Sequence, residues 1–468
     1  MSESRALSTI TRADVDSLTK KRGEPEWLEK LRLSAFEAYF EADQPNIRLD
    51  DWRKTLVETV DLTAISQICG GSSKAKQNVK ADYEKILTNV SGVVSVVNGV
   101  RSELYIDDEV AKKGVIFTTF EDAITNHGEL IKEYLENGTN REIGKLSLMN
   151  SAFFTSGAFL YIPKNVTVDA PFVIVNTIAE DAQLGQAIFP RVIVVADENA
   201  AVKVVNVFDG CNAQSQAAPP PAKGKARAKR EWIFTSAIVD IAAKQAANVH
   251  YLELYNLGRS VFSVSRNNNI VARDAFVYSF TAALGGGQLK SDIVTELKDR
   301  GATSDVRGIV LGDGEEHFYY NTVQNHDSPD TKSDINFRVA LKGNAVSSYQ
   351  GNIKVALTAS RTDAFQSNKN LLLSETAKAE SIPRLEILTD DVKCSHGATV
   401  GPVDKNQLFY LMTRGLSEKE AEEFIVTGFF ASLLASLKIE GAAQWIEDLI
   451  GDKIHAEETQ KELSGIRS

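Results

Sequence analysis

The sequence predicts a mainly β protein in which a solenoid of short parallel strands lies between helical N- and C-terminal regions. Three observations predict this class. Apolar residues recur at helical spacing near both ends of the chain, short runs rich in Val, Ile, Phe and Tyr fill its middle, and a small residue recurs there at a regular interval. We place the helical regions at residues 1–147 and 404–468 and the strand-rich core at residues 148–403.

Two helices are predicted in the N-terminal region. The first covers residues 24–42, where Pro25 suits a first helical turn. The second covers residues 120–137 and ends at an Asn-Gly pair, which is a stop signal. Their apolar positions are Trp27, Leu28, Leu31, Phe36, Tyr39 and Phe40 in the first and Ala123, Ile124, Ile131, Tyr134 and Leu135 in the second.

The middle of the chain contains runs typical of strands of about five residues, such as FVIVNT, VHYLELYNL and SDVRGIVLG. Few of them adjoin an Asn-Gly or Asp-Gly dipeptide, which speaks against a meander or a sandwich. Ala247, Ala275 and Ala302 each precede such a run, at intervals of 28 (275 − 247) and 27 (302 − 275) residues. A repeat of this size predicts coils of short parallel strands. Ala200 and Ala345 fit the repeat only if insertions are allowed.

One segment interrupts the strand pattern. Residues 213–231 contain three prolines followed by alternating Ala and Lys or Arg, which cannot form a core strand. We interpret it as a basic surface loop between strands, either a solvated loop without a special role or a contact for an acidic partner.

The C-terminal region returns to a helical pattern. Ser417 and Glu420 form a predicted capping box. A second helix is predicted around AAQWIEDLI. The helices either pack on their own domain or dock a partner. The apolar stripe of the first comprises Phe424, Ile425, Phe429, Leu433, Leu434 and Leu437.

Composition narrows the class of protein. Of 468 residues, 43% are hydrophobic and 25% charged, and the formal net charge of −11 gives no reason to expect a nucleic-acid partner. Cys69, Cys211 and Cys394 are too few and too widely spaced for a disulfide framework, which fits a reducing compartment. No apolar run reaches membrane-helix length and the N-terminus lacks a signal-peptide core, so we expect a cytoplasmic protein.

Local signatures of catalysis are missing from the sequence. It contains no GxSxG, HExxH or GxGxxG pattern. The segment GGGQLKS does not meet the phosphate-loop pattern, because Leu289 stands where glycine must precede Lys290. His317 and His326 are nine residues apart, which matches no compact metal motif. We therefore do not predict an enzyme.

The segment DDVKCSHGATVG brings Cys394 and His396 within two positions of each other. In an extended strand both side chains point to one face. Three interpretations remain open from the residues alone. The pair is half of a site for a thiophilic metal such as iron, a cysteine nucleophile activated by histidine, or a structural pair.

Several blocks of the chain resemble the SufB/SufD family of iron–sulfur cluster assembly scaffolds. The likeness spans most of the chain and is strongest from about residue 300 to 430. At the site, CSHGATVG has the form of the SufD branch, whereas SufB-type chains usually read CEHEA. The other blocks are QLFYLMTRGLSEKEAEEFIVTGFF, RTDAFQSNKNLLLSETAKAESIPRLEI, EHFYYNTVQNHDSPDTKSD, GEPEWLEKLRLSAFEAYF and DDWRKT.

The resemblance implies a right-handed parallel β-helix between helical ends. It also implies that the chain pairs with SufB through the β-helix and docks a SufC ATPase through its C-terminal helices. No cofactor is expected to stay bound, and a transient iron–sulfur cluster or iron would be shared with SufB. His396 matches the family's ligand histidine and Cys394 its neighbouring cysteine, while Arg414, Gly415 and the helix through Phe429 match the region that contacts SufC.

Two other functions are compatible with parts of the pattern. The first is a SufB-like scaffold that forms a homodimer and binds SufC without SufB. The second is a β-helix enzyme that acts on polysaccharide, which the absence of a signal peptide disfavours. For the SufD branch, a homodimer is one form that this chain could take when SufB is missing.

Overall fold

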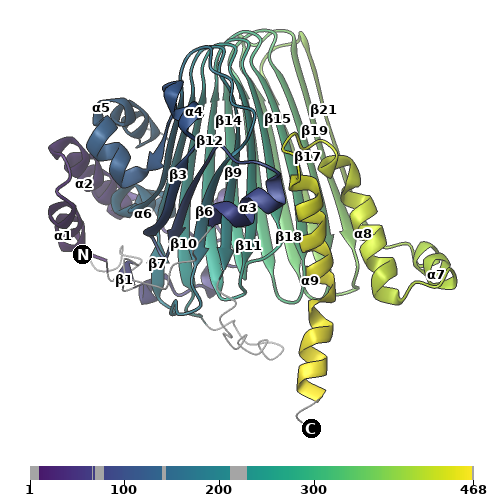
Figure 1. Cartoon of the computed structure of the whole chain (residues 1–468). Coiled ribbons are helices and arrows are strands. Elements are labelled where there is room, and N and C mark those ends of the chain that lie inside the picture. Colours follow the sequence, from purple (N-terminus) through teal and green to yellow (C-terminus); the bar gives the residue numbers. More distant parts are fainter. Residues whose placement is uncertain (1–9, 66, 69–78, 140–143, 211–228, 466–468) are drawn as a thin grey trace.

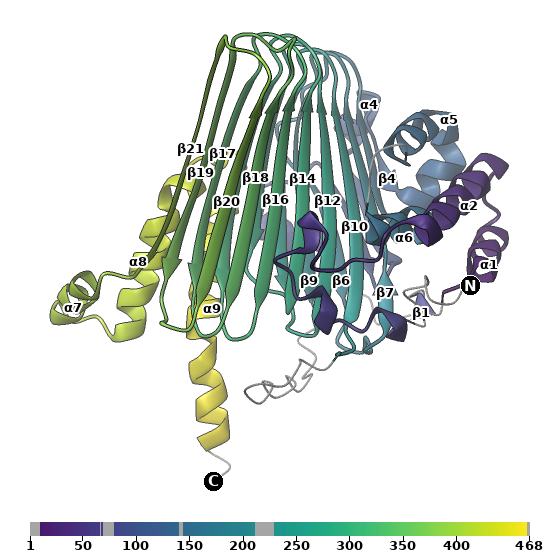
Figure 2. The same cartoon turned by 180° about the vertical axis from the view of Figure 1, so that it is seen from behind.

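The computed structural model describes residues 10–65, 67–68, 79–139, 144–210 and 229–465. Its centre is a parallel β-helix whose coils form two facing sheets, with helices at both ends of the chain (Figures 1 and 2). The predicted fold class, a parallel β-helix between helical regions, is confirmed. Among the described residues, no helix combines the length and hydropathy needed to cross a bilayer.

One sheet has 11 strands and the other has 10. In the 11-stranded sheet the spatial order is β20 (Lys378–Ile387), β18 (Val346–Val355), β16 (His317–His326), β14 (Gln288–Leu297), β12 (Val261–Val271), β10 (Ile233–Ala243), β8 (Pro190–Ala196), β5 (Ser156–Ile162) and β4 (Ile116–Thr119), with β7 (Gln186–Ile188) beside β10 and β1 (Gln67–Ile68) beside β7. In the 10-stranded sheet it is β21 (Val392–Pro402), β19 (Thr362–Leu372), β17 (Lys332–Leu341), β15 (Thr303–Gly312), β13 (Phe276–Ala283), β11 (Asn248–Leu257), β9 (Ala201–Gly210), β6 (Phe172–Ile178), β2 (Gly92–Val97) and β3 (Val100–Ile106).

The sequence repeat corresponds to one coil of the β-helix. Asn248 pairs with Phe276, and Phe276 pairs with Thr303, in parallel register. The preceding residues, Ala247, Ala275 and Ala302, are buried at the corners where the chain enters the strands, which explains why they must be small. Ala200 stands at the same corner before β9, whereas Ala345 precedes β18 in the other sheet.

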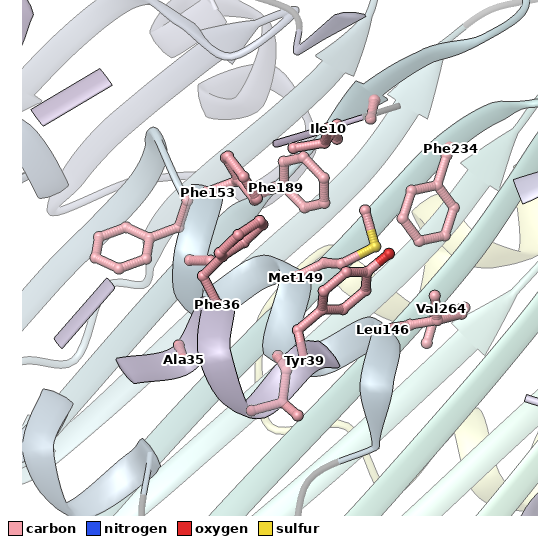
Figure 3. Close-up of a cluster of buried hydrophobic side chains, with 14 of the residues drawn as sticks. Ile10, Ala35, Phe36, Tyr39, Leu146, Met149, Phe153, Phe189, Phe234 and Val264 are labelled. Carbon is pink, nitrogen blue, oxygen red and sulfur yellow. The ribbon is translucent and has the colours of Figure 1, made fainter. Parts of the chain in front are cut away.

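The N-terminal helices cover the outer face of the 11-stranded sheet. Figure 3 shows part of their shared apolar cluster, in which Phe36 packs against Phe153 and Tyr39 lies beside Met149. Phe234 of β10 and Phe189, between β7 and β8, join the cluster from the β-helix. A segment with short 3₁₀ helices crosses the same sheet. The helices are α1 (Arg12–Arg22), α2 (Glu26–Glu41), α5 (Phe120–Thr139) and α6 (Lys145–Phe153), and the 3₁₀ helices are η2 (Asp50–Trp52), η3 (Val57–Thr59) and η4 (Leu62–Ala64).

Sheet structure begins earlier in the chain than residue 148. The strands β2, β3 and β4 lie within residues 92–119 and join the two sheets by parallel and antiparallel pairing. β2 and β3 are joined by Asn98 and Gly99, both at positive φ, which is the hairpin turn that an Asn-Gly pair favours. The short helix α4 (Asp108–Lys112) follows this hairpin.

Helices α8 (Glu418–Leu434) and α9 (Ala442–Gly465) cover the outer face of the 10-stranded sheet, together with α3 (Val79–Leu87). Helix α7 (Lys405–Thr413) projects away from the sheet (Figures 1 and 2). The capping box of Ser417 and Glu420 is confirmed at the start of α8. The apolar residues predicted to form one stripe on α8 lie on two faces of this helix. Leu433 and Leu434 are buried against the sheet, whereas Phe424 is 65% exposed.

The interior of the β-helix contains a chain of hydrogen-bonded polar side chains between its apolar clusters. Asn206 donates to the Tyr251 hydroxyl (2.9 Å), which donates to Glu253 Oε1 (3.0 Å). Asn267 Nδ2 donates to Glu253 Oε2 (2.9 Å). Glu253 is fully buried, and this burial raises its pKa to about 7.

Candidate functional site

Cys394 and His396 lie on β21, the last strand of the 10-stranded sheet. In the described part of the chain, β21 has a neighbour on one side only, β19. Ala364 pairs with Cys394 and Gln366 with His396. Because residues two apart in a strand share a face, both side chains point to the inner face of the open end of the β-helix.

Cys394 is half-buried. It packs against a small apolar cluster that includes Ile353, Val355 and Ala364. Burial raises the pKa of the Cys394 thiol, the Ala364 backbone N–H opposes this, and the negative charge of Asp363 adds to it. A raised pKa disfavours the thiolate, which is the form that a nucleophile or a metal ligand needs.

His396 is exposed, unlike the other two histidines that the sequence singled out. His326 is buried, with Nδ1 2.8 Å from Thr331 Oγ1 and Nε2 2.9 Å from Ser333 Oγ, and burial lowers its pKa to about 4. His317 is buried beside Tyr319. An exposed imidazole at a strand edge is therefore the one of these three that can reach a ligand outside the chain.

The open end is formed by two sheet edges. The last strands, β20 and β21, are 10 and 11 residues long, and the β21 edge carries backbone groups that no strand among the described residues pairs. Exposed apolar side chains accompany the edges, with Ile387 37%, Leu388 61% and Val400 49% exposed. Edges of this length with apolar neighbours are templates for pairing with another chain.

An exposed imidazole and a buried amide lie on neighbouring strands at this end. His396 offers a ring nitrogen, and the in-register Gln366 has a buried Oε1 atom with no hydrogen-bond partner in the described residues. An imidazole nitrogen suits iron as well as zinc, copper and nickel. His396 is therefore a residue that could contribute one ligand to an iron ion or cluster.

A second candidate surface lies between α8, which packs on the 10-stranded sheet, and α7, which projects away from the β-helix (Figures 1 and 2). Here an apolar groove of about 640 Å³ runs between the two helices. The exposed fractions of Phe409 and Tyr410 are 68% and 56%. The groove is lined by Leu371, Asn406, Gln407, Tyr410, Leu411, Phe424, Ile425, Gly428 and Phe429.

All three residues predicted to contact SufC belong to this α7–α8 unit. Arg414 ends α7, and its guanidinium lies 5.1 Å from the Tyr410 ring centre and donates to the Tyr410 hydroxyl (3.1 Å). Gly415 follows with φ +99°, a conformation that favours glycine. Phe429 lines the groove, while Arg338 of β17 donates to its carbonyl oxygen and holds α8 on the sheet.

Other sequence candidates have structural roles or lie outside the described residues. In GGGQLKS, an added Cβ at Gly287 would lie 2.3 Å from the Arg259 carbonyl oxygen, so close packing explains the glycine. Lys290 is buried and pairs with Asp292 at 2.6 Å. Cys69, Cys211 and residues 213–228 of the predicted basic loop lie outside the described residues.

Sequence reasoning missed Gln366 and Arg338. Gln366 was noted only as part of a longer block, and no local pattern distinguishes it from other amides in strands. The position of Gln366 beside His396 follows from the register of β19 and β21. The role of Arg338 follows from the docking of α8 on the sheet, where Arg338 donates to the Phe429 carbonyl oxygen.

Comparisons with known proteins agree along the chain. Residues 177–429 match the description "SUF system FeS cluster assembly, SufBD core domain", and residues 12–174 match "SufBD protein N-terminal region". The chain is 29% identical over 445 residues to the iron–sulfur cluster assembly protein SufD of Bacillus subtilis (strain 168), covering 94% of this chain and 96% of that protein. It is 25% identical over 467 residues to an iron–sulfur cluster assembly SufBD family protein of Staphylococcus epidermidis (strain ATCC 12228 / FDA PCI 1200), covering 94% and 92%.

Proposed function

The chain belongs to the SufBD family of the SUF iron–sulfur cluster assembly system, and from this premise we propose that it is the SufD-type subunit of a SufB–SufC–SufD complex. It acts there as an accessory scaffold and not as an enzyme. Similarity to a protein named SufD along 94% of the chain supports the SufD type. The observation that carries the proposal is the open end, where an exposed imidazole lies beside two sheet edges.

The partner at the open end is SufB. Strand addition to an exposed edge supplies a row of backbone hydrogen bonds, and apolar side chains beside the edge add buried area. Both sheets end at the same face of the β-helix, so one partner with a similar end can pair with both edges at once. The exposed Ile387, Leu388 and Val400 are the side chains that this pairing would cover.

The cargo is iron or a nascent iron–sulfur cluster, which is held transiently between the two chains. His396 supplies one ligand from this side, and SufB supplies others. Ligands divided between two chains can be pulled apart when one chain moves against the other, which allows release of the cargo. Cys394 remains a predicted second ligand, although its packing and raised pKa favour a thiol that stays protonated.

The groove between α7 and α8 is the docking site for SufC. It is apolar, exposed and flanked by aromatic side chains, which are the residue types that dominate binding at protein interfaces. Arg414, Gly415 and Phe429 shape it from the connecting turn and from α8. Because Arg338 and Lys342 anchor α8 to β17 and the turn after it, a movement of SufC would be transmitted to the sheet that ends in β21.

Anaerobic reconstitution with SufB, SufC, iron and sulfide tests the proposal. We expect His396→Ala to form the complex, as judged by size-exclusion chromatography, and to lose most of the iron–sulfur absorbance. Lys393→Ala, an exposed change on the same strand, is the matched control and should assemble clusters like the wild type. Normal cluster assembly by His396→Ala would refute a ligand role, and failure of the wild-type chain to bind SufB would refute the SufD type.

A further inference from the structure

The last strand of the 11-stranded sheet, β20, gains little stability from the interior of the β-helix. None of its side chains is buried, whereas most of those on the neighbouring β18 are. In the part of the chain that the structure describes, β20 pairs with β18 alone. A strand that is paired on one side and buries so little side chain is expected to fray from the end of the sheet unless another contact holds it.

A segment of the N-terminal region, residues 49–64, crosses the outer face of this sheet (Figure 2) and is called the strap below. It is anchored by Trp52 and Val57, which are 7% and 4% exposed. Thr55 Oγ1 donates to the Trp52 carbonyl oxygen (2.8 Å), and the Lys290 ammonium of β14 lies 4.9 Å from the Trp52 ring centre. The strap is therefore fixed to the coil that contains β14.

From this anchor the strap reaches past β16 and β18 to β20. Asp50 accepts two hydrogen bonds from the Arg384 guanidinium, one of them from Nη2 to Oδ1 at 3.0 Å. Lys54 Nζ lies 2.6 Å from Glu380 Oε1. Residues four apart in a strand share a face, so Glu380 and Arg384 both project from the outer face of β20. The strap thus holds the strand at two points, through residues 334 and 326 positions apart in the sequence.

We propose that the strap is a brace that holds β20 in position for pairing with a partner chain, and that Asp50 and Lys54 are its positioning residues. The inference rests on the proposed function, in which this partner is SufB. A strand that is already ordered loses less conformational entropy when a further strand pairs with its free edge. Both contacts are made by side chains on the outer face, so they leave the backbone groups of the edge available.

The two contacts are charged and partly exposed. The hydrogen bonds from Arg384 hold the pKa of Asp50 below its ordinary value, so this pair stays charged at neutral pH. The Asp50 and Arg384 side chains are 53% and 43% exposed. Because an exposed ion pair is a modest contact, both pairs should be removed together for a clear effect. Salt screens such pairs, so the effect of their removal should shrink in about 1 M NaCl.

Hydrogen–deuterium exchange of the full chain in the absence of SufB tests the brace. The backbone N–H groups of Lys378 and Leu388 donate to β18 and the residue before it at 3.0 Å each, at the two ends of the ladder. We expect the Asp50→Asn/Lys54→Met double variant to exchange the amides of residues 378–388 about fivefold faster than wild type. Its midpoint of urea unfolding should match that of the control described next.

Glu198→Gln is the matched control, because it removes an exposed ion pair with Lys164 at the opposite end of the β-helix. It should leave the exchange of residues 378–388 unchanged. Asp50→Arg combined with Arg384→Asp restores one pair with its charges reversed, and we expect it to return the exchange close to the wild-type rate, whereas Asp50→Arg alone should speed it. Exchange in the double variant no faster than in the control would overturn the brace.

Calorimetric titration with SufB tests the role of the brace in pairing. The double variant carries both changes on the strap and none on β20, and we expect it to bind SufB about fivefold more weakly than wild type or the control. Unchanged SufB affinity despite faster exchange, or weaker binding without faster exchange, would overturn this role. If the wild-type chain does not bind SufB, the proposed function fails, while exchange in the free chain still decides whether the strap holds β20.

Discussion

Replacing the buried Glu253 with glutamine should stabilise the protein at pH 8. Burial raises the Glu253 pKa from its ordinary value of 4.5 to about 7, so the folded chain binds this proton more tightly than the unfolded chain does. The stabilisation that comes from the protonated carboxyl is therefore complete below pH 4.5 and is lost as the pH rises to 7. Each pKa unit corresponds to about 1.36 kcal/mol, and the shift of 7 − 4.5 makes the loss about 3 kcal/mol.

Glutamine removes the charge and keeps the hydrogen bonds. The Tyr251 hydroxyl donates to the carbonyl oxygen as before. If the Asn267 amide turns over, its Oδ1, which has no partner among the described residues, accepts from the new Nε2. We therefore expect Glu253→Gln to raise the free energy of unfolding by up to about 3 kcal/mol at pH 8 and to change it little at pH 5.

Urea unfolding of both proteins at pH 5, 6, 7 and 8, followed by tryptophan fluorescence, measures this difference. Glu129→Gln, at an exposed position on α5, is the control and should shift no midpoint by a pH-dependent amount. A difference between Glu253→Gln and wild type that does not grow with pH, or that is destabilising at pH 8, would refute the assignment of a charged carboxylate to this interior.

Two further predictions concern the partner surfaces. Val400→Lys, at a position 49% exposed beside the β21 edge, should weaken the SufB complex at least tenfold in a pull-down titration, whereas Leu184→Lys, 47% exposed and far from that end, should have no effect. Phe424→Ala should weaken SufC binding about tenfold or more in calorimetry, because it removes an aromatic side chain from the groove. Equal SufC affinity for Phe424→Ala and for Leu104→Ala, an exposed change elsewhere, would show that SufC binds another surface.

The core of the fold could be predicted from the sequence because every coil of the β-helix needs a small residue at the same corner. Ala247, Ala275 and Ala302 must be small at each buried corner, and this constraint leaves a period in the sequence. The strands β2 and β3 were not predicted, because they form a single antiparallel hairpin that does not repeat along the sequence. Their signal was the pair Asn98-Gly99.

The site was predicted in part. CSHG marked Cys394 and His396 through a family pattern, and their shared strand face follows from the two-residue period. The difference in burial between Cys394 and His396 comes from packing against residues that are distant in the sequence. Cys394 lies against Ile353 and Val355 of the opposite sheet, and Gln366 reaches toward Gly351 there. A local sequence pattern does not indicate contacts between residues on different sheets. The burial of the Cys394 thiol and the unpartnered Gln366 amide oxygen therefore could not be predicted from the sequence.

The two edges of the open end differ in how they resist unwanted pairing. β20 carries Pro383 and an outward row of Lys378, Glu380, Arg384 and Glu386, which are the devices that prevent aggregation at exposed strands. β21 contains a single charged residue, Lys393. By this measure β21 is the edge more prone to pairing with a second copy of the chain. If SufB covers β21 as proposed, binding it would also protect the chain from self-association at that edge.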